Sequence, residues 1–145
     1  MKKFKFRLQT LLEQRQSIED HLLTELGDLR QEEAREQQSL EDMQGKLAET
    51  WETLATMKRP DAQTLECFDH FAQTLRDDIK VQKLTIEGVQ ARVEAKRVEL
   101  TEAMKQRKVI EALRDKQERA YIDAAQRAEQ STLDEMSSLR FARGM

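Results

Sequence analysis

The sequence predicts an all-α protein: an antiparallel two-helix coiled coil, or long α-helical hairpin, with a longer C-terminal helix. Charged residues make up 37% of the chain and aromatic residues 5%, a composition typical of long helices rather than of a globular core. Apolar or small residues recur at alternating steps of three and four, the spacing of a coiled-coil seam. Pro60 is the single proline. We therefore expect one break, and residues 1–145 are expected to form a single coiled-coil hairpin.

The first helix is expected to cover about residues 4–58, with its start near Phe4 or Leu8. Its seam has apolar residues at Phe4, Leu8, Leu11, Ile18 and Leu22, and continues one position later at Leu26, Leu29, Leu40, Met43, Leu47, Leu54 and Met57. The change of position comes from consecutive four-residue steps, a stutter. Glu33 and Glu36 occupy seam positions, so a loose or hydrated layer is expected there.

The expected turn lies at about residues 59–62. Pro60 lacks an amide hydrogen and biases Arg59 away from helical geometry. Asp61 or Thr64 can cap the helix that follows. Because the connection is short, the two helices are expected to be antiparallel neighbours.

The second helix is expected to cover about residues 63–141, since no proline follows Pro60. Its seam runs through Leu65, Phe68, Ala72, Leu75, Ile79, Ile86, Val89, Val93, Leu100, Ala103, Ile110, Tyr121, Ala124 and Ala128. Such a narrow apolar row needs a partner helix to cover it.

Charge supports pairing between the two halves of the chain. Residues 13–49 hold 4 basic and 11 acidic side chains, whereas residues 92–119 hold 9 basic and 6 acidic ones. Reflection about position 60 places residue 4 near residue 116. The last part of the second helix, from about residue 117, is therefore expected to lack a partner within the chain, and its seam thins to Tyr121, Ala124, Ala128, Ser131 and Glu135.

No catalytic, cofactor-binding or metal-binding pattern is recognisable in the sequence, so we expect no enzyme activity and no cofactor. His21 and His70 fall on different helices, and the lone Cys67 fits a reducing compartment. The net charge of −3 disfavours nucleic acid as a partner. No apolar run reaches the length of a membrane span. A cytoplasmic protein without direct membrane insertion is the resulting expectation.

Both ends of the chain resemble the flagellar export protein FliJ family. The start, Phe4-Lys5-Phe6-Arg7-Leu8-Gln9-Thr10-Leu11-Leu12, is similar to the family's F-x-F-x-L-x-x-L-L opening. The run from Arg107 to Lys116 is similar to its R-K-x-x-E-x-L-x-x-K segment. Further similarities to its C-terminal signature lie at Tyr121, Arg127-Ala128-Glu129-Gln130, Leu133-Asp134-Glu135 and Arg140-Phe141. The resemblance covers nearly the whole chain.

This resemblance implies a non-enzymatic component of the flagellar type III protein export apparatus, similar in plan to the central stalk of rotary ATPases. Its implied partners are the hexameric flagellar export ATPase, the cytoplasmic domain of the export gate membrane protein, and export chaperones. The implied location is cytoplasmic and peripheral, at the inner-membrane face of the flagellar base. The implied role is that of a stalk-like coupler that assists the delivery of chaperones and substrates.

Two sets of residues are candidate binding sites. The ATPase-ring set combines a basic arm at the N-terminus with residues of the unpartnered segment: Lys2, Lys3, Lys5, Arg7, Arg119, Tyr121, Arg127, Arg140 and Arg143. The export-gate set lies near the turn, where the resemblance places the gate contact: Leu47, Trp51, Leu54, Phe71 and Leu75. The aromatic residues near the turn could instead form a hydrophobic plug that closes the hairpin.

Other interpretations stay open at this point. An injectisome type III secretion stalk protein would have the same architecture, and a homodimeric coiled-coil scaffold would have a similar composition. A nucleic-acid binder acting through Lys2, Lys3, Lys5 and Arg7 is disfavoured by the acidic residues that follow.

Overall fold

A computed structural model describes residues 2–144; Met1 and Met145, the ends of the expected 1–145 hairpin, lie outside the described residues. The chain forms α1 (Gln9–Thr56) and α2 (Ala62–Arg143), of 48 and 82 residues, and the described part contains no strand. The predicted all-α hairpin with a longer second helix is confirmed. The chain divides into two compact units. We call His21–Leu100 the hairpin unit, and the residues before and after it the terminal unit.

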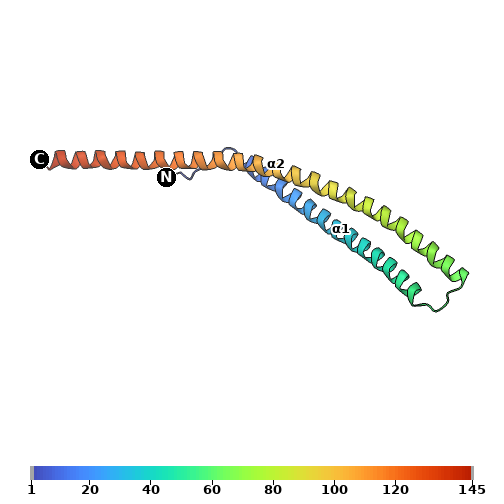
Figure 1. Cartoon of the computed structure of the whole chain (residues 1–145). Coiled ribbons are helices and arrows are strands. Elements are labelled where there is room, and N and C mark those ends of the chain that lie inside the picture. The colour runs from blue at the N-terminus through green and yellow to red at the C-terminus, as the bar shows by residue number, and fades with distance from the viewer. Residues whose placement is uncertain (1, 145) are drawn as a thin grey trace. The chain divides into compact units, whose positions relative to one another are not determined.

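The hairpin unit contains the turn between the two helices, which run side by side in opposite directions (Figure 1). Arg59, directly before Pro60, has a φ of 51°, a left-handed conformation that ends the helical run. Asp61 caps α2: its Oδ1 accepts a hydrogen bond of 2.7 Å from the amide of Thr64. Hydrogen bonds from Thr64 hold the pKa of Asp61 below its usual value. The predicted turn and one of its two candidate caps are thus present.

The core of the hairpin unit is the predicted seam. Leu26 is buried on α1, and the buried apolar residues on α2, together with the buried Gln82, follow one another at steps of three and four: Ala72, Leu75, Ile79, Ile86 and Val89. Gln82 stands at a seam position and donates hydrogen bonds to the backbone oxygen and the carboxylate of Glu36. The layer that was expected to be loose is therefore bridged by direct polar contacts.

The terminal unit corrects the predicted start of the first helix. Residues 2–6 have no regular secondary structure, Arg7 and Leu8 form a turn, and α1 begins at Gln9, next to the expected start at Leu8 and not near Phe4. Burial alternates along this N-terminal arm (residues 2–8): Phe6 is only 8% exposed, whereas its neighbours Lys5 and Arg7 are exposed. A period of two is the pattern of extended chain, in which successive side chains point to opposite sides.

The extended arm also changes the register. The ring of Phe4 packs against that of Tyr121, with centroids 5.6 Å apart, so residue 4 meets residue 121 rather than a position near 116. Extended chain advances about 3.3 Å per residue, against 1.5 Å in a helix, so the arm reaches farther along α2. From residue 126 onward every described residue of the terminal unit is exposed. The unpartnered part of α2 therefore begins after the Phe4–Tyr121 contact, not at 117.

Candidate partner-binding surfaces

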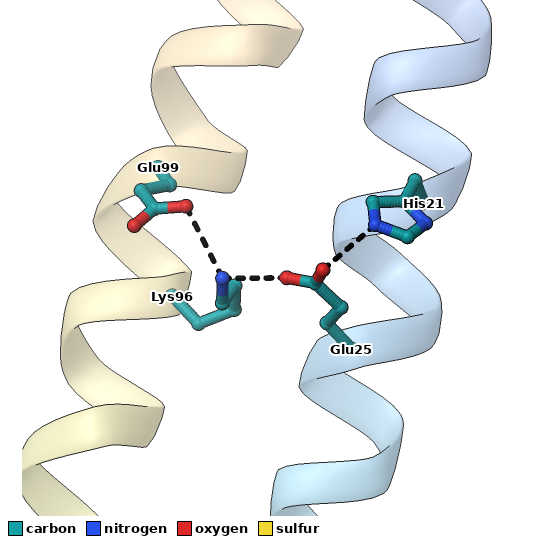
Figure 2. A network of polar contacts seen from close by, with 4 residues as sticks. All are labelled: His21, Glu25, Lys96 and Glu99. Carbon is teal, nitrogen blue, oxygen red and sulfur yellow. Dashed lines mark hydrogen bonds and ion pairs between the residues drawn. The ribbon is translucent and has the colours of Figure 1, made fainter.

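Charged layers join the two helices inside the hairpin unit. Lys96 lies between two carboxylates, 2.5 Å from Glu25 on α1 and 3.3 Å from Glu99 on its own helix (Figure 2). On its other side, Glu25 contacts His21 at 2.7 Å. The hydrogen bond between Glu25 and Lys96 is the largest cause of both pKa shifts, lowering the pKa of Glu25 and raising that of Lys96. Both groups are therefore held in their charged forms.

Further layers repeat this arrangement of an acid on α1 and a base or amide on α2. In the hairpin unit, both terminal nitrogens of Arg92 donate to Glu32, at 2.9 and 3.4 Å. In the terminal unit, Arg107 pairs with Glu19 and, at 2.7 Å, with Glu111. These contacts join the acidic and basic segments that the charge distribution paired. Flanking pairs of this kind choose partner and orientation more than they add stability.

The basic residues of the predicted ATPase-ring set remain free of such pairing. All eight are exposed, and within residues 2–144 none of their side chains forms an ion pair: Lys2, Lys3, Lys5, Arg7, Arg119, Arg127, Arg140 and Arg143. Arg140 and Arg143 stand in the last turn of α2, where cations also interact favourably with the helix dipole. The eight cations are thus accessible. Those of the arm have no acid among them, whereas along residues 122–143 three arginines are accompanied by four acids.

Tyr121 differs from the other members of this set. It is half-buried, because its ring packs against Phe4 of the arm. Its position joins the arm to α2 within the terminal unit. Tyr121 therefore holds the arm in place, and only part of its surface is available to another molecule.

The end of α2 offers more apolar surface than the sequence suggested. We call residues 122–143 the free segment. Phe141 of this segment is 69% exposed, and four more of its large apolar side chains are about half exposed: Ile122, Leu133, Met136 and Leu139. Beyond Tyr121 the half-buried position is Ala125 rather than the predicted Ala124. Continued at steps of three and four from Tyr121 and Ala125, the row passes through Thr132, Met136 and Leu139, which are all exposed. The row predicted from the 3.5-residue spacing follows small and polar residues instead: Ala124, Ala128, Ser131 and Glu135.

The hollows along the free segment are grooves of a single helix. Three of them lie between residues 121 and 139, and each is lined only by side chains of α2. Small-molecule sites are concave and usually enclosed. A surface of this kind is suited to another polypeptide rather than to a small ligand.

The predicted export-gate set divides into buried and exposed members. Leu75 is only 7% exposed and belongs to the core, and Leu47 and Leu54 are half-buried. Trp51 and Phe71 are 39% and 50% exposed. The set is thus split: the leucines pack inside the hairpin unit, and the side chains of Trp51 and Phe71 reach its surface.

A cation–π contact organises the exposed aromatic surface. The guanidinium of Arg76 lies 5.3 Å from the centre of the Trp51 ring. Leu65 and Met57, close to the turn, are also 45% and 39% exposed. Neither residue was in the predicted export-gate set. Leu65 comes before Ala72, the first buried residue of the seam on α2, so its position at the end of the seam was the signal that it would be exposed.

Other chemistry is sparse in the described residues. No group of three or more His, Cys, Asp or Glu side chains among residues 2–144 could hold a metal ion. Cys67 is exposed and carries a free thiol. None of the helices in the described part of the chain is both long and apolar enough to cross a membrane.

Comparison with known proteins identifies the family. A family model described as "Flagellar FliJ protein" matches residues 4–145, nearly the full length of the chain. No curated protein and no solved structure matches the chain. The match includes residues 4–8 of the arm, both helices and the free segment. The chain therefore belongs to the FliJ family, whose members are components of the flagellar export apparatus.

Proposed function

We propose that this protein is a non-catalytic coupler in flagellar type III export. In this proposal the terminal unit binds the hexameric export ATPase, the hairpin unit binds the cytoplasmic domain of the export gate, and the protein assists the delivery of chaperones and substrates. It acts in the cytoplasm, associated peripherally with the flagellar base. The family supplies the setting. The assignment of surfaces to partners is our inference from the two exposed regions.

The free segment is the observation that carries the ATPase assignment. A helix that continues for more than 20 residues with exposed Leu133, Met136 and Leu139 gains little stability from the rest of the terminal unit. Its apolar row is suited to a partner helix. The unpaired charges of the arm add an electrostatic attraction that raises the rate of association more than the final affinity. In this proposal the free segment supplies the contact surface for the ATPase, and the charges of the arm speed the encounter with it.

The first test is a truncation after Tyr121. It removes the free segment and keeps the Phe4–Tyr121 contact, so the arm stays on α2 and the pairing of α1 with α2 within each unit is kept. We expect the truncated protein to lose binding to the export ATPase and stimulation of its ATP hydrolysis, with the helix content of the remaining residues unchanged by circular dichroism. Full stimulation by the truncated protein would exclude the free segment as the ring-binding element.

The second test separates steering from contact. Replacing Lys2, Lys3, Lys5 and Arg7 by Ala should slow association with the ATPase, and the difference should shrink as salt rises, because exposed charges are screened within about 8 Å at 0.15 M. A matched control removes four exposed lysines of the other parts of the chain: Lys46, Lys58, Lys80 and Lys83. An equal slowing in both variants would mean that net charge, not the arm, governs association.

The gate assignment rests on Trp51 and Phe71. Because both are exposed, Ala at these positions should weaken binding to the gate's cytoplasmic domain without melting the hairpin unit. Substitution of Leu75 mainly tests folding, since this side chain is buried. Phe141→Ala removes a comparably exposed aromatic residue from the terminal unit and serves as the control. If it weakens gate binding as much as Phe71→Ala does, the surface near the turn is not the gate site.

A further inference from the structure

The hairpin unit carries a second apolar row, on the face of α2 turned away from α1. It contains Val81, Leu84, Gly88, Ala91, Ala95 and Val98, spaced three and four residues apart. All six are exposed, and the three large members are 63%, 66% and 61% exposed. The buried seam of the same stretch runs through Gln82, Ile86 and Val89. On a helix the two rows stand on opposite faces, so α2 is apolar on two sides between residues 81 and 98.

Contacts within the chain do not account for this outer row. A helix whose polar face meets water needs no regular apolar spacing there. Gly88, the one glycine inside α2, weakens the helix relative to Ala. A Cβ built at this position meets no atom within 4 Å, and the φ of Gly88 is not positive. Neither α1 nor the backbone conformation therefore requires glycine here. A glycine followed by Ala91 and Ala95 leaves a shallow strip along which another helix can approach closely.

Charge beside the row indicates what kind of helix fits. On a coiled-coil reading, one edge carries Lys80, Glu87 and Glu94, and the other carries Asp78, Thr85, Arg92 and Glu99. Arg92 is engaged with Glu32 of α1, Glu94 with Arg97, and Glu99 with Lys96. Asp78 and Glu87 have no charged partner within residues 2–144, and of the two bases on the edges Lys80 has none either. The edges thus hold more acid than base, and their unpaired acids favour a helix with basic flanks.

A second copy of this chain fits the row by shape but not by charge. In an antiparallel pair, Leu84 would face Ala95 and Gly88 would face Ala91, which is sterically favourable. The same register would place Glu87 against Glu94 on one edge and Asp78 against Glu99 on the other. Like charges at flanking positions disfavour a pairing. Self-association through this face is therefore the poorer match.

We propose that the outer row of α2 is a third interaction surface, which binds an amphipathic α-helix of a partner protein with an apolar seam and Lys or Arg on both flanks. The row spans 18 residues, or roughly 27 Å of helix. With a contact about one helix diameter wide, the buried area falls below the range of stable protein interfaces, among the weak and transient ones. The complex is therefore weak and readily exchanged. This proposal is independent of the ATPase and gate assignments, because its residues belong to neither set.

The test uses two synthetic peptides of three heptads, each held helical by a covalent staple on its outer face. Both have Leu at the two seam positions; one has Lys and the other Glu at the flanking positions. Binding to the full chain is measured by fluorescence anisotropy of the labelled peptide. We expect the Lys peptide to bind, and the Glu peptide to bind about tenfold more weakly or less.

Variants of the full chain locate the site. Leu84→Gln with Val98→Gln should weaken binding of the Lys peptide about tenfold. Val109→Gln, which changes an equally exposed valine outside the row, should leave binding unchanged. Gly88→Leu is the sharpest variant: it adds apolar surface and improves helix propensity, yet it should weaken binding, because it fills the strip. Circular dichroism checks that each variant keeps its helix content.

Three results would overturn the proposal. Equal binding to the Leu84/Val98 and Val109 variants would place the peptide elsewhere. Tighter binding to the Gly88→Leu variant would mean that the peptide responds to apolar surface alone and not to a fitted strip. A dimer in sedimentation velocity that the Leu84/Val98 variant abolishes would make a second copy the occupant.

Discussion

The N-terminal arm should determine how stably the terminal unit is closed, and Phe6→Ala tests this. Phe6 is the arm's anchor: it is 8% exposed, although the chain around it has no regular secondary structure. Backbone hydrogen bonds add little: the amide of Gln9 donates to the carbonyl of Phe6 at 3.1 Å, within the chain's own turn. The arm is therefore held mainly by the side chains of Phe6 and Phe4.

The expected loss follows from the burial of Phe6. Truncating a buried Phe to Ala costs about 3–5 kcal/mol in a globular core. The arm lies at the surface and can collapse onto the gap, so we take the lower end, about 3 kcal/mol. Because 1.4 kcal/mol is a factor of ten, the opening equilibrium of the terminal unit should rise about 100-fold. Phe4→Ala should cost less, since Phe4 is half-buried and an aromatic pair adds only about 0.5–1.5 kcal/mol.

Hydrogen exchange measured by residue is the suitable assay. In the Phe6→Ala variant, amides of residues 9–20 and of α2 near Tyr121 should exchange about 100-fold faster, while those of the hairpin unit core stay protected. Phe141→Ala, at a 69% exposed side chain, is the control and should change nothing measurable. A change below threefold near residue 9, or an equal change around Val89, would refute the view of the arm as a clasp on the terminal unit.

Three further predictions concern the hairpin unit. Asp61→Ala should lower the melting temperature at neutral pH. Because the pKa of Asp61 is depressed in the folded protein, the stabilisation by its carboxylate in the wild type should be lost as pH falls below about 4. Thermal melts at a series of pH values measure both effects. Glu25→Leu alone should destabilise the hairpin unit more than Glu25→Leu combined with Lys96→Leu. The single change leaves the half-buried amine of Lys96 with the carboxylate of Glu99 but without that of Glu25. Denaturant titration of the double-mutant cycle measures the difference in the free energy of unfolding. In the wild type the contribution of this pair should be lost as pH falls through the lowered pKa of Glu25, or rises through the raised pKa of Lys96. Val89→Ala, at a side chain 1% exposed, should cost about 2–3 kcal/mol in the same titration.

The sequence was most informative where a single rule governs structure. A 3.5-residue repeat and one proline were enough to predict two helices, and Asp61 was correctly among the candidate caps. The prediction of a helix from residue 4 was wrong because two spacings fit the arm. Phe4, Leu8 and Leu11 have helical spacing, while Phe4, Phe6 and Leu8 have the spacing of extended chain. The two patterns differ only in whether Phe6 is buried, and periodicity alone cannot decide that.

The error in register and the mixed result at the gate set have physical causes of their own. Reflection about Pro60 assumes that both sides advance at the helical rise, so an extended arm moves the meeting point to Tyr121. Leu75 was a candidate contact residue although it stands on the seam, and a seam residue is buried by its partner helix. If seam residues are assigned to the packing between the helices and only the residues beside the seam to partner binding, Phe71 stays in the export-gate set and Leu75 does not.

The polar layers explain why so much of α2 remains available for other molecules. An entirely apolar seam would pair with almost any amphipathic helix, whereas Lys96 and Arg107 each pair with one acid of their own helix and one acid of the partner helix. α1 supplies the partner acids, Glu25 for Lys96 and Glu19 for Arg107, so α1 is the favoured occupant of the seam. The outer row and the free segment lack such layers among their exposed apolar residues and are not matched to α1. A partner can therefore bind α2 at these places without competing for the seam that holds the hairpin together.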